Sequence, residues 1–172
     1  MLALLDLDET LIDRRSAFTL WARRFVDAHD LGETEWTWLH DLDSTCRPRE
    51  TFFAKVYARY GVGGSSTALW DDYRDQIPRL AEPFDGVTQE LKLLRERRWR
   101  LFVVSNGKSD NQRAKLRRTG LAKLVDGSFI SEEMGCKAPQ RTILTWWQTS
   151  GLGNHAPNLW RARAHTARSP LR

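Results

Sequence analysis

The sequence predicts an α/β protein in which a parallel sheet is interrupted by an inserted helical bundle. Three observations carry this prediction. A short apolar run at residues 2–5 leads into two aspartates, four helical stripes follow one another over residues 16–82, and a second apolar run spans Trp99–Val104. Strands that are separated by helical segments are typical of parallel sheets, so the long helical stretch is an insertion into a sheet domain.

The first strand ends in Leu5-Asp6-Leu7-Asp8, which has the clearest chemical signature of the chain. Apolar residues on both faces indicate a strand buried on both sides, and an open α/β sheet binds ligands at the carboxyl ends of its strands. Asp6 and Asp8 are therefore a candidate nucleophile and acid/base group, with a cation to offset their repulsion. For Asp-x-Asp alone, the alternative is a solvated acidic turn.

The four helices predicted between residues 16 and 82 form a compact bundle. We expect Ser16 to cap the first, Pro48 to open the third and Gly61 to end it, with the fourth stopping before Pro78. Their apolar residues at helical spacing are Phe18, Trp21, Phe25 and Val26, then Trp38, Leu39 and Leu42, then Phe52, Phe53, Val56 and Tyr60, and finally Leu69, Tyr73 and Ile77. These side chains are predicted to form a core and not to bind a cofactor.

The sheet pattern resumes near Pro83 with an amphipathic helix and then the second strand, which ends in Ser105-Asn106-Gly107. A hydroxyl and backbone N–H groups at the start of a helix form an anion site. The same residues also suit a plain strand-to-helix turn, so the motif alone leaves both interpretations open. The remaining predicted elements are a third strand at residues 124–130 and a last helix at residues 140–149.

Composition limits the class of protein. The 172 residues suffice for one α/β core and a small inserted domain. The two cysteines, Cys46 and Cys136, indicate neither a disulfide framework nor a zinc site, which fits a reducing cytosol. Residues 1–5 are too short for a signal peptide, and no apolar run has the length of a membrane span. The chain is therefore predicted to be cytoplasmic, with no membrane partner.

The net charge of +5 comes mainly from residues 151–172, which carry four arginines and no acidic residue. A basic tail can bind phosphate backbones non-specifically. No aromatic interleaving or groove-reading motif accompanies it, so no specific nucleic-acid partner is predicted. The composition changes abruptly to Arg, Ala, His and Pro in this tail, which predicts that it is disordered.

Three stretches, in the same order, resemble the motifs of the haloacid dehalogenase-like (HAD) hydrolases, a superfamily of phosphatases with an aspartate nucleophile. They are Asp6-Leu7-Asp8-Glu9-Thr10-Leu11, Val103-Val104-Ser105-Asn106-Gly107 and Ser131-Glu132-Glu133-Met134-Gly135-Cys136-Lys137. Lys137, which alone reads as a surface lysine, matches the lysine of the third motif. The family commonly has Lys-Pro there, whereas Ala138 separates Lys137 from Pro139.

The resemblance implies a Rossmann-like, three-layer α/β/α core made of residues 1–15 and 83–150. It implies that residues 16–82 are a helical cap over the active site. It further implies a Mg²⁺-dependent hydrolase that removes phosphate from a small phosphorylated metabolite, a phosphomonoester, through an aspartyl-phosphate.

The resemblance also assigns roles to single residues. Asp6 is the nucleophile, and Asp8 protonates the leaving alcohol and then activates water. The Asp6 carboxylate and the Asp8 backbone carbonyl bind Mg²⁺. Ser105, the Asn106 amide and Lys137 bind the phosphoryl oxygens.

The family's fourth motif has no counterpart in the sequence. That motif places one or two aspartates at the end of another strand, and no Asp or Glu follows Glu133. The sheet is therefore predicted to lack its C-terminal strands, which leaves the first strand as an apolar edge prone to self-association. We expect a shortened or frame-shifted family member, and the frame shift is contradicted if no alternative reading frame of the gene encodes a strand that ends in aspartate.

Two alternatives to the phosphatase stay open. A phosphomutase shares every residue named above. A truncated, catalytically weak or inactive binding protein would keep the fold and the phosphate pocket without efficient metal chemistry, and the absent fourth motif favours it. The sequence identifies neither the metabolite nor an oligomeric state. Asp8 argues against a dehalogenase, because that branch of the family lacks an aspartate at this position.

Overall fold

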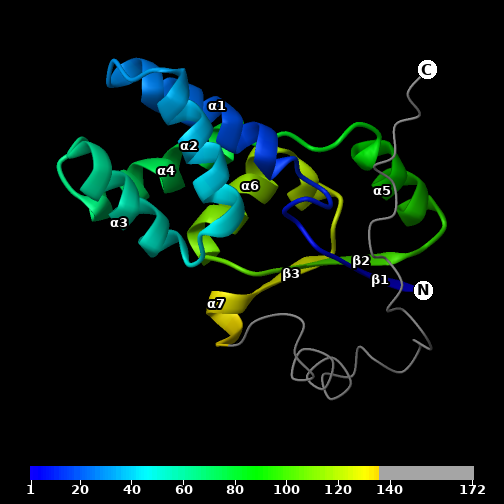
Figure 1. The fold of residues 1–172 in the computed structure, drawn as a ribbon. Helices are drawn as coiled ribbons and strands as arrows, with labels where there is room; N and C mark the ends of the chain where they lie inside the picture. Colours follow the sequence, from blue (N-terminus) through cyan, green and yellow to red (C-terminus); the bar gives the residue numbers. More distant parts are fainter. Residues whose placement is uncertain (136–172) are drawn as a thin grey trace, which may run out of the picture. The chain divides into compact units, whose positions relative to one another are not determined.

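The computed structural model describes residues 1–135, which divide into two compact units. One unit contains Met1–Asp13 and the chain from Pro83 onward, and the other is Arg14–Glu82. Figure 1 shows the first as a sheet with helices and the second as helices alone. The predictions for Lys137, for the helix at 140–149, for the tail at 151–172 and for the absent strands concern residues outside the described part of the chain.

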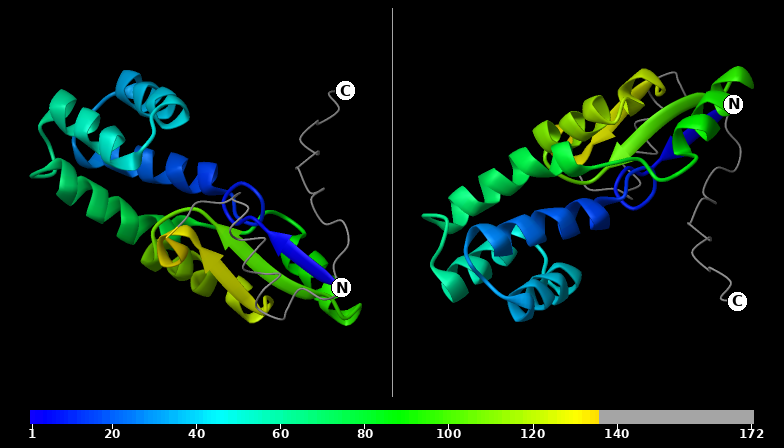
Figure 2. Two further views of the ribbon diagram at one scale, coloured as in Figure 1. Left: turned by 90° about the horizontal axis from the view of Figure 1, so that it is seen from below. Right: turned by 90° about the horizontal axis from the view of Figure 1, so that it is seen from above.

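The first unit is built on three parallel strands, β1 (Leu2–Leu5), β2 (Arg100–Ser105) and β3 (Gly127–Ile130), in the order β1-β2-β3. The helices α5 (Val87–Glu96) and α6 (Ser109–Arg118) precede and follow β2. Both crossovers run in one direction along the sheet, so right-handed connections place both helices on one face (Figures 1 and 2). The predicted α/β class with a parallel sheet is confirmed.

The two faces of the sheet differ because side chains alternate along each strand. Ala3, Leu101 and Val103 are buried on the face that carries the helices. The opposite face carries an apolar cluster of Leu2, Leu4, Phe102 and Phe129, in which the two phenyl rings stack with centroids 5.6 Å apart. The predicted three-layer arrangement needs further helices on this second face, and among the described residues of the first unit α5 and α6 both lie on the other face (Figure 2).

Asp126 joins the start of β2 to the segment before β3. Its Oδ2 atom accepts a hydrogen bond from the Leu101 N–H at 2.7 Å, and its own N–H donates to the Leu101 carbonyl at 2.7 Å. Its Oδ1 atom also pairs with Arg95 Nη1 at 3.4 Å. One carboxylate thus satisfies a backbone donor at the edge of the core.

Replacing Asp126 by Ala should lower the free energy of unfolding by about 1–3 kcal/mol, because the partly buried Leu101 N–H loses its acceptor. Urea denaturation followed by circular dichroism measures this loss. Asp85→Ala is the matched control, since Asp85 is an exposed residue of the same unit. Equal unfolding midpoints for the two variants would contradict the expected role of Asp126.

The second unit contains four helices, which are α1 (Arg14–Ala28), α2 (Glu33–Thr45), α3 (Arg49–Tyr60) and α4 (Ser66–Leu80). Trp21 lies at the centre of their core. Its ring stacks on Phe25 at 5.3 Å between centroids and meets Phe53 and Tyr73 edge-on at 5.7 and 5.0 Å. The predicted apolar stripes of the first, third and fourth helices are buried here, apart from Tyr60, which is half-buried at the end of α3.

Three predicted boundaries are wrong by a few residues. Helix α1 begins at Arg14 and not at Ser16, and the Arg14 guanidinium pairs with Asp43 of α2. Helix α4 continues through Pro78 to Leu80, because a proline in a last turn removes only one backbone hydrogen bond. The third strand is restricted to Gly127–Ile130, since residues 124–126 form a turn after the 3₁₀ helix η1 (Leu121–Lys123).

Among the described residues, no helix has the length and the apolar character that crossing a membrane requires.

Candidate active site

The loop after β1 presents Asp6 and Asp8 on the same side because Leu7 between them is fully buried. The Leu7 carbonyl accepts hydrogen bonds from the N–H groups of Leu11 and Ile12, both at 3.0 Å. The Leu7 N–H donates to Asp6 Oδ1 at 2.8 Å, which holds that carboxylate over the start of the loop. Local folding around one apolar side chain therefore aims both carboxylates away from the core.

The adjacent strand β2 ends in Ser105, which is buried, followed by Asn106 and Gly107. Gly107 has a φ of +146°, and a Cβ atom at this position would come within 3.1 Å of the Gln112 Nε2 atom. A glycine is needed here for both reasons, because a side chain would be strained and would displace Gln112. The corner thus brings the start of α6 close to the end of β2.

Gln112 connects the ends of the two strands. Its Nε2 atom lies 3.0 Å from Asp8 Oδ2, 2.9 Å from Ser105 Oγ and 2.9 Å from the Asn106 carbonyl oxygen. Strands β1 and β2 are neighbours in the sheet, so their carboxyl ends meet at one edge. The structure therefore brings the predicted residues Asp8, Ser105 and Asn106 together around a single amide.

Lys115 is the second unexpected contact of Asp8. Its Nζ atom lies 2.8 Å from Asp8 Oδ1 and 2.9 Å from Oδ2. The lysine side chain is 4% exposed and that of Asp8 is 24% exposed, so this pair is shielded from water on the side of the helix. Both carboxylate oxygens of Asp8 are engaged by a positive charge.

The pKa of Asp6 is raised above its ordinary value of 3.8. Partial burial of the carboxyl is the main cause, and the negative charge of Asp8 adds to it. The hydrogen bond from the Leu7 N–H and the positive charge of Lys115 act in the opposite direction without cancelling the rise. A carboxylate with a raised pKa is more basic, which favours nucleophilic attack once it is ionised.

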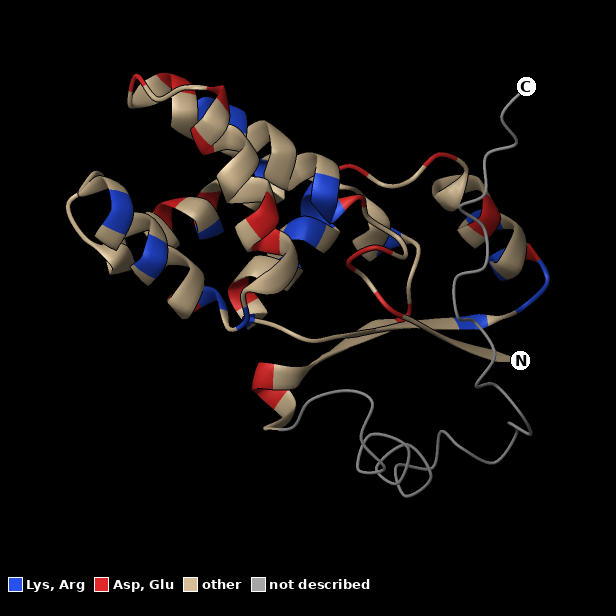
Figure 3. Ribbon diagram, in the orientation of Figure 1, with Lys and Arg blue, Asp and Glu red and all other residues tan. Residues whose placement is uncertain are grey.

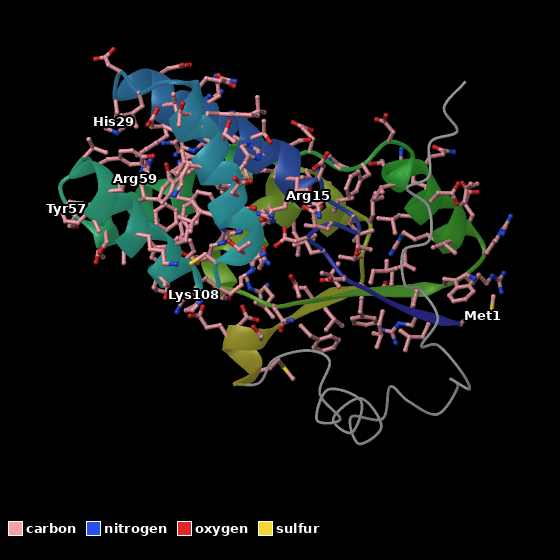
Figure 4. The ribbon with its side chains drawn as sticks, viewed as in Figure 1. Met1, Arg15, His29, Tyr57, Arg59 and Lys108 are labelled. Atoms are coloured by element: carbon pink, nitrogen blue, oxygen red, sulfur yellow. The ribbon has the colours of Figure 1, made fainter. Side chains whose placement is uncertain are left out.

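Helix α7 (Ser131–Met134) is held against the start of α6 by a set of polar contacts. The Gly107 N–H donates to Ser131 Oγ at 3.0 Å, Lys108 pairs with Glu132 at 2.8 Å, and Arg113 donates two hydrogen bonds to Glu133 at 2.6 and 2.7 Å. Figure 3 shows the acidic residues of α7 in red, and Figure 4 labels Lys108. These contacts fix the segment that leads toward Lys137.

The donor set suits a hard divalent cation. Asp6 offers an exposed carboxylate, and Mg²⁺ is bound in proteins by one or two carboxylates, with waters and substrate phosphate completing the octahedron. The Asp8 carboxylate is occupied by Lys115 and Gln112. Residues 1–135 contain no group of three or more acidic, His or Cys side chains that could hold a metal without such help.

The site lies within the part of the chain that matches a known family. A model of the haloacid dehalogenase-like hydrolases matches residues 1–145. The chain belongs to this family.

Individual relatives of this HAD hydrolase are distant. The Bacillus subtilis (strain 168) protein named HAD-hydrolase YfnB is 23% identical over 157 residues, which cover 83% of this chain and 66% of the relative. The chain thus spans slightly less than two thirds of that relative's length. A crystal structure of YfnB bound to magnesium has a TM-score of 0.73 at 20% identity, and the match covers 90% of this chain and 73% of that chain.

Two further solved structures share the fold. A Thermotoga maritima protein named as a β-phosphoglucomutase has a TM-score of 0.71 at 15% identity, with 91% of this chain and 72% of that chain covered. A subfamily IA hydrolase of the HAD superfamily from Geobacter sulfurreducens has a TM-score of 0.63 at 17% identity, with 87% and 72% covered. Likeness at these identities shows the α/β fold alone.

Proposed function

We propose that this HAD hydrolase removes phosphate from a small phosphomonoester through an aspartyl-phosphate on Asp6. The observation that carries the proposal is the meeting of Asp8 and Ser105 at Gln112, because it joins the ends of the two strands where the family's first and second motifs lie. The Asp6 carboxylate beside them is solvent-accessible and more basic than an ordinary aspartate.

The reaction takes two steps at one carboxylate. Asp6 attacks phosphorus in line, the P–O bond to the alcohol breaks, and Asp8 gives its proton to the departing oxygen. Asp8 then takes a proton from water, which hydrolyses the acyl-phosphate and regenerates Asp6. Ser105 and the Asn106 amide bind the phosphoryl oxygens, and Lys137 contributes positive charge to them.

Mg²⁺ held by the Asp6 carboxylate and the Asp8 carbonyl would neutralise the charge of the phosphoryl group as it approaches. The helical unit Arg14–Glu82 is proposed to serve as the cap. A phosphomutase is the second candidate, since it uses the same residues and a structure named as a β-phosphoglucomutase shares the fold. The two differ in whether water or a sugar phosphate receives the phosphoryl group.

Release of inorganic phosphate from para-nitrophenyl phosphate tests the proposal. We expect release with Mg²⁺ and its loss when EDTA removes the metal, because two anions must otherwise approach each other without compensation. Incubation with a sugar monophosphate distinguishes the mutase, which would isomerise it instead of releasing phosphate. Folded protein that releases no phosphate above background, with and without Mg²⁺, would contradict the proposed hydrolase.

A further inference from the structure

Gln112 and Lys115 are the two buried polar side chains of helix α6, with 2% and 3% of their surfaces exposed. They lie three residues apart, so both project from the side of the helix that also buries Leu116. The neighbouring Arg113, Arg117 and Arg118 are exposed. The helix therefore turns one polar pair inward and keeps its other charges in solvent.

Gln112 and Lys115 present only hydrogen-bond donors to Asp8. Lys115 Nζ reaches both carboxylate oxygens, at 2.8 and 2.9 Å, and Gln112 Nε2 reaches Oδ2 at 3.0 Å. In the free protein the carboxylate oxygens of Asp8 accept these three contacts, and the proposed acid step requires Asp8 to take up a proton after substrate binds while the two side chains keep it in place. Contacts on both oxygens fix the rotation of the carboxylate as well as its position.

The same pair ties Asp8 to the proposed phosphate-binding residues. Gln112 Nε2 contacts Ser105 Oγ and the Asn106 carbonyl, both at 2.9 Å. Asp8 is 104 residues from Gln112 in the sequence, whereas Ser105 is seven residues away. One amide therefore sets the spacing between the first strand's loop and the second strand's loop.

A purely structural role explains this arrangement poorly. Buried ion pairs contribute little net stability, and apolar side chains of similar size serve a core equally well or better. Here the pair is placed on the one aspartate to which the proposed reaction assigns proton transfer. Proton transfer requires the carboxyl to lie within hydrogen-bond reach of the reacting oxygen, and small displacements reduce the rate strongly.

We infer that Lys115 and Gln112 are positioning residues, which hold the Asp8 carboxylate at a fixed distance and orientation from the phosphate-binding residue Ser105. The inference rests on the proposed function, since it states how Asp8 is held for its part in the reaction. Neither residue touches the reacting atoms. Both act through Asp8.

Two substrates of the same shape test the inference. Phenyl phosphate has a basic leaving group that needs a proton from Asp8, whereas para-nitrophenyl phosphate has a weakly basic one that departs with less help. We expect Lys115→Met to lower kcat/KM, which covers the step in which the alcohol leaves and not the later water step, about 10- to 100-fold on phenyl phosphate and much less on para-nitrophenyl phosphate. Arg117→Met is the matched control, as it removes an exposed charge from the same helix, and it should change neither rate. Equal losses on both substrates, or no loss, would overturn the inference.

A double-mutant cycle gives a readout that does not depend on hydrolysis. Asp8→Asn leaves the buried Lys115 without its anion, and Lys115→Met leaves the partly buried Asp8 without its cation. The melting temperature of the double variant should therefore lie well above the value that the two separate losses predict. Additive losses would show that Lys115 does not hold Asp8 and would overturn the inference. If the wild-type chain releases no phosphate, the proposed function fails, and so does the expected effect of Lys115→Met on the rate. The double-mutant cycle still shows in that case whether Lys115 holds Asp8.

Discussion

Asp6→Asn should abolish phosphate release, lowering kcat by about 10³-fold or more. An amide cannot attack phosphorus to form the acyl-phosphate, so the covalent step is lost. Asp8 is engaged by Lys115 and Gln112, so it is poorly placed to substitute. The loss should appear in kcat with little change in stability, because Asp6 is solvent-accessible and its carboxyl accepts a backbone hydrogen bond only from its chain neighbour Leu7 among the described residues. Initial rates on para-nitrophenyl phosphate with Mg²⁺ measure the change.

Glu9→Gln is the control for Asp6→Asn, because it removes one negative charge from the same loop without changing either aspartate. Its activity should stay within about threefold of wild type, the range expected from a long-range charge effect alone. The melting temperatures of both variants should match that of the wild-type chain. An Asp6→Asn variant that keeps more than a few per cent of the wild-type rate would show that Asp6 is not the nucleophile.

The sequence could predict the position of the aspartates because the evidence for it is local. The alternation of β1 continues into the residues after it, which places Leu7 in the core and so puts Asp6 and Asp8 outside it. The order of apolar strands and helical stripes is local as well, and it predicted the α/β class and the helical unit. Helix and strand ends were less predictable, because partners far along the chain help to decide them, as Asp43 does for Arg14.

Gln112 and Lys115 could not be predicted in the same way. Helix α6 is polar and basic on most faces, and residue type alone does not distinguish the buried Lys115 from the exposed Arg117. The signal lies in their spacing with Leu116, the i, i+3, i+4 pattern of an inward face. Its meaning depends on Asp8, 107 residues from Lys115 in the sequence, becoming a neighbour when β1 pairs with β2.

Asp43 is the second residue whose replacement should have a large effect, this time on stability. It is buried within the helical unit, where Arg14 of α1 donates to both of its oxygens, at 3.1 and 2.9 Å, and Arg49 of α3 pairs with it at 2.5 Å. A single carboxylate of α2 thus joins three helices. Asp43→Asn leaves two partly buried guanidinium groups without their anion and should lower the free energy of unfolding by about 3–5 kcal/mol.

The pH dependence of the same variant identifies the cause. Burial alone would raise the pKa of Asp43, but the hydrogen bonds from Arg14 and the charges of Arg49 and Arg14 outweigh it and hold the pKa below 3.8. A carboxyl whose pKa is lower in the folded state stabilises the fold above its unfolded pKa, and this stabilisation is lost as the pH falls through the folded pKa. Wild-type stability should therefore decline below about pH 4, the range in which an unfolded aspartate gains its proton.

Asp43→Asn should be less stable than wild type at pH 7 and should approach it in acid, since the unfolded wild-type chain then gains a proton that the folded carboxylate resists, which reduces the advantage of the charged side chain. Urea unfolding followed by near-ultraviolet circular dichroism at pH 7 and pH 3 measures the difference in the aromatic core around Trp21. Asp41→Asn is the matched control, because Asp41 lies two residues earlier in α2 and is exposed, and it should keep the wild-type profile. The same difference in the free energy of unfolding between Asp43→Asn and wild type at both pH values would contradict this expectation. It would show that the negative charge of Asp43 is not what stabilises the contact among the three helices.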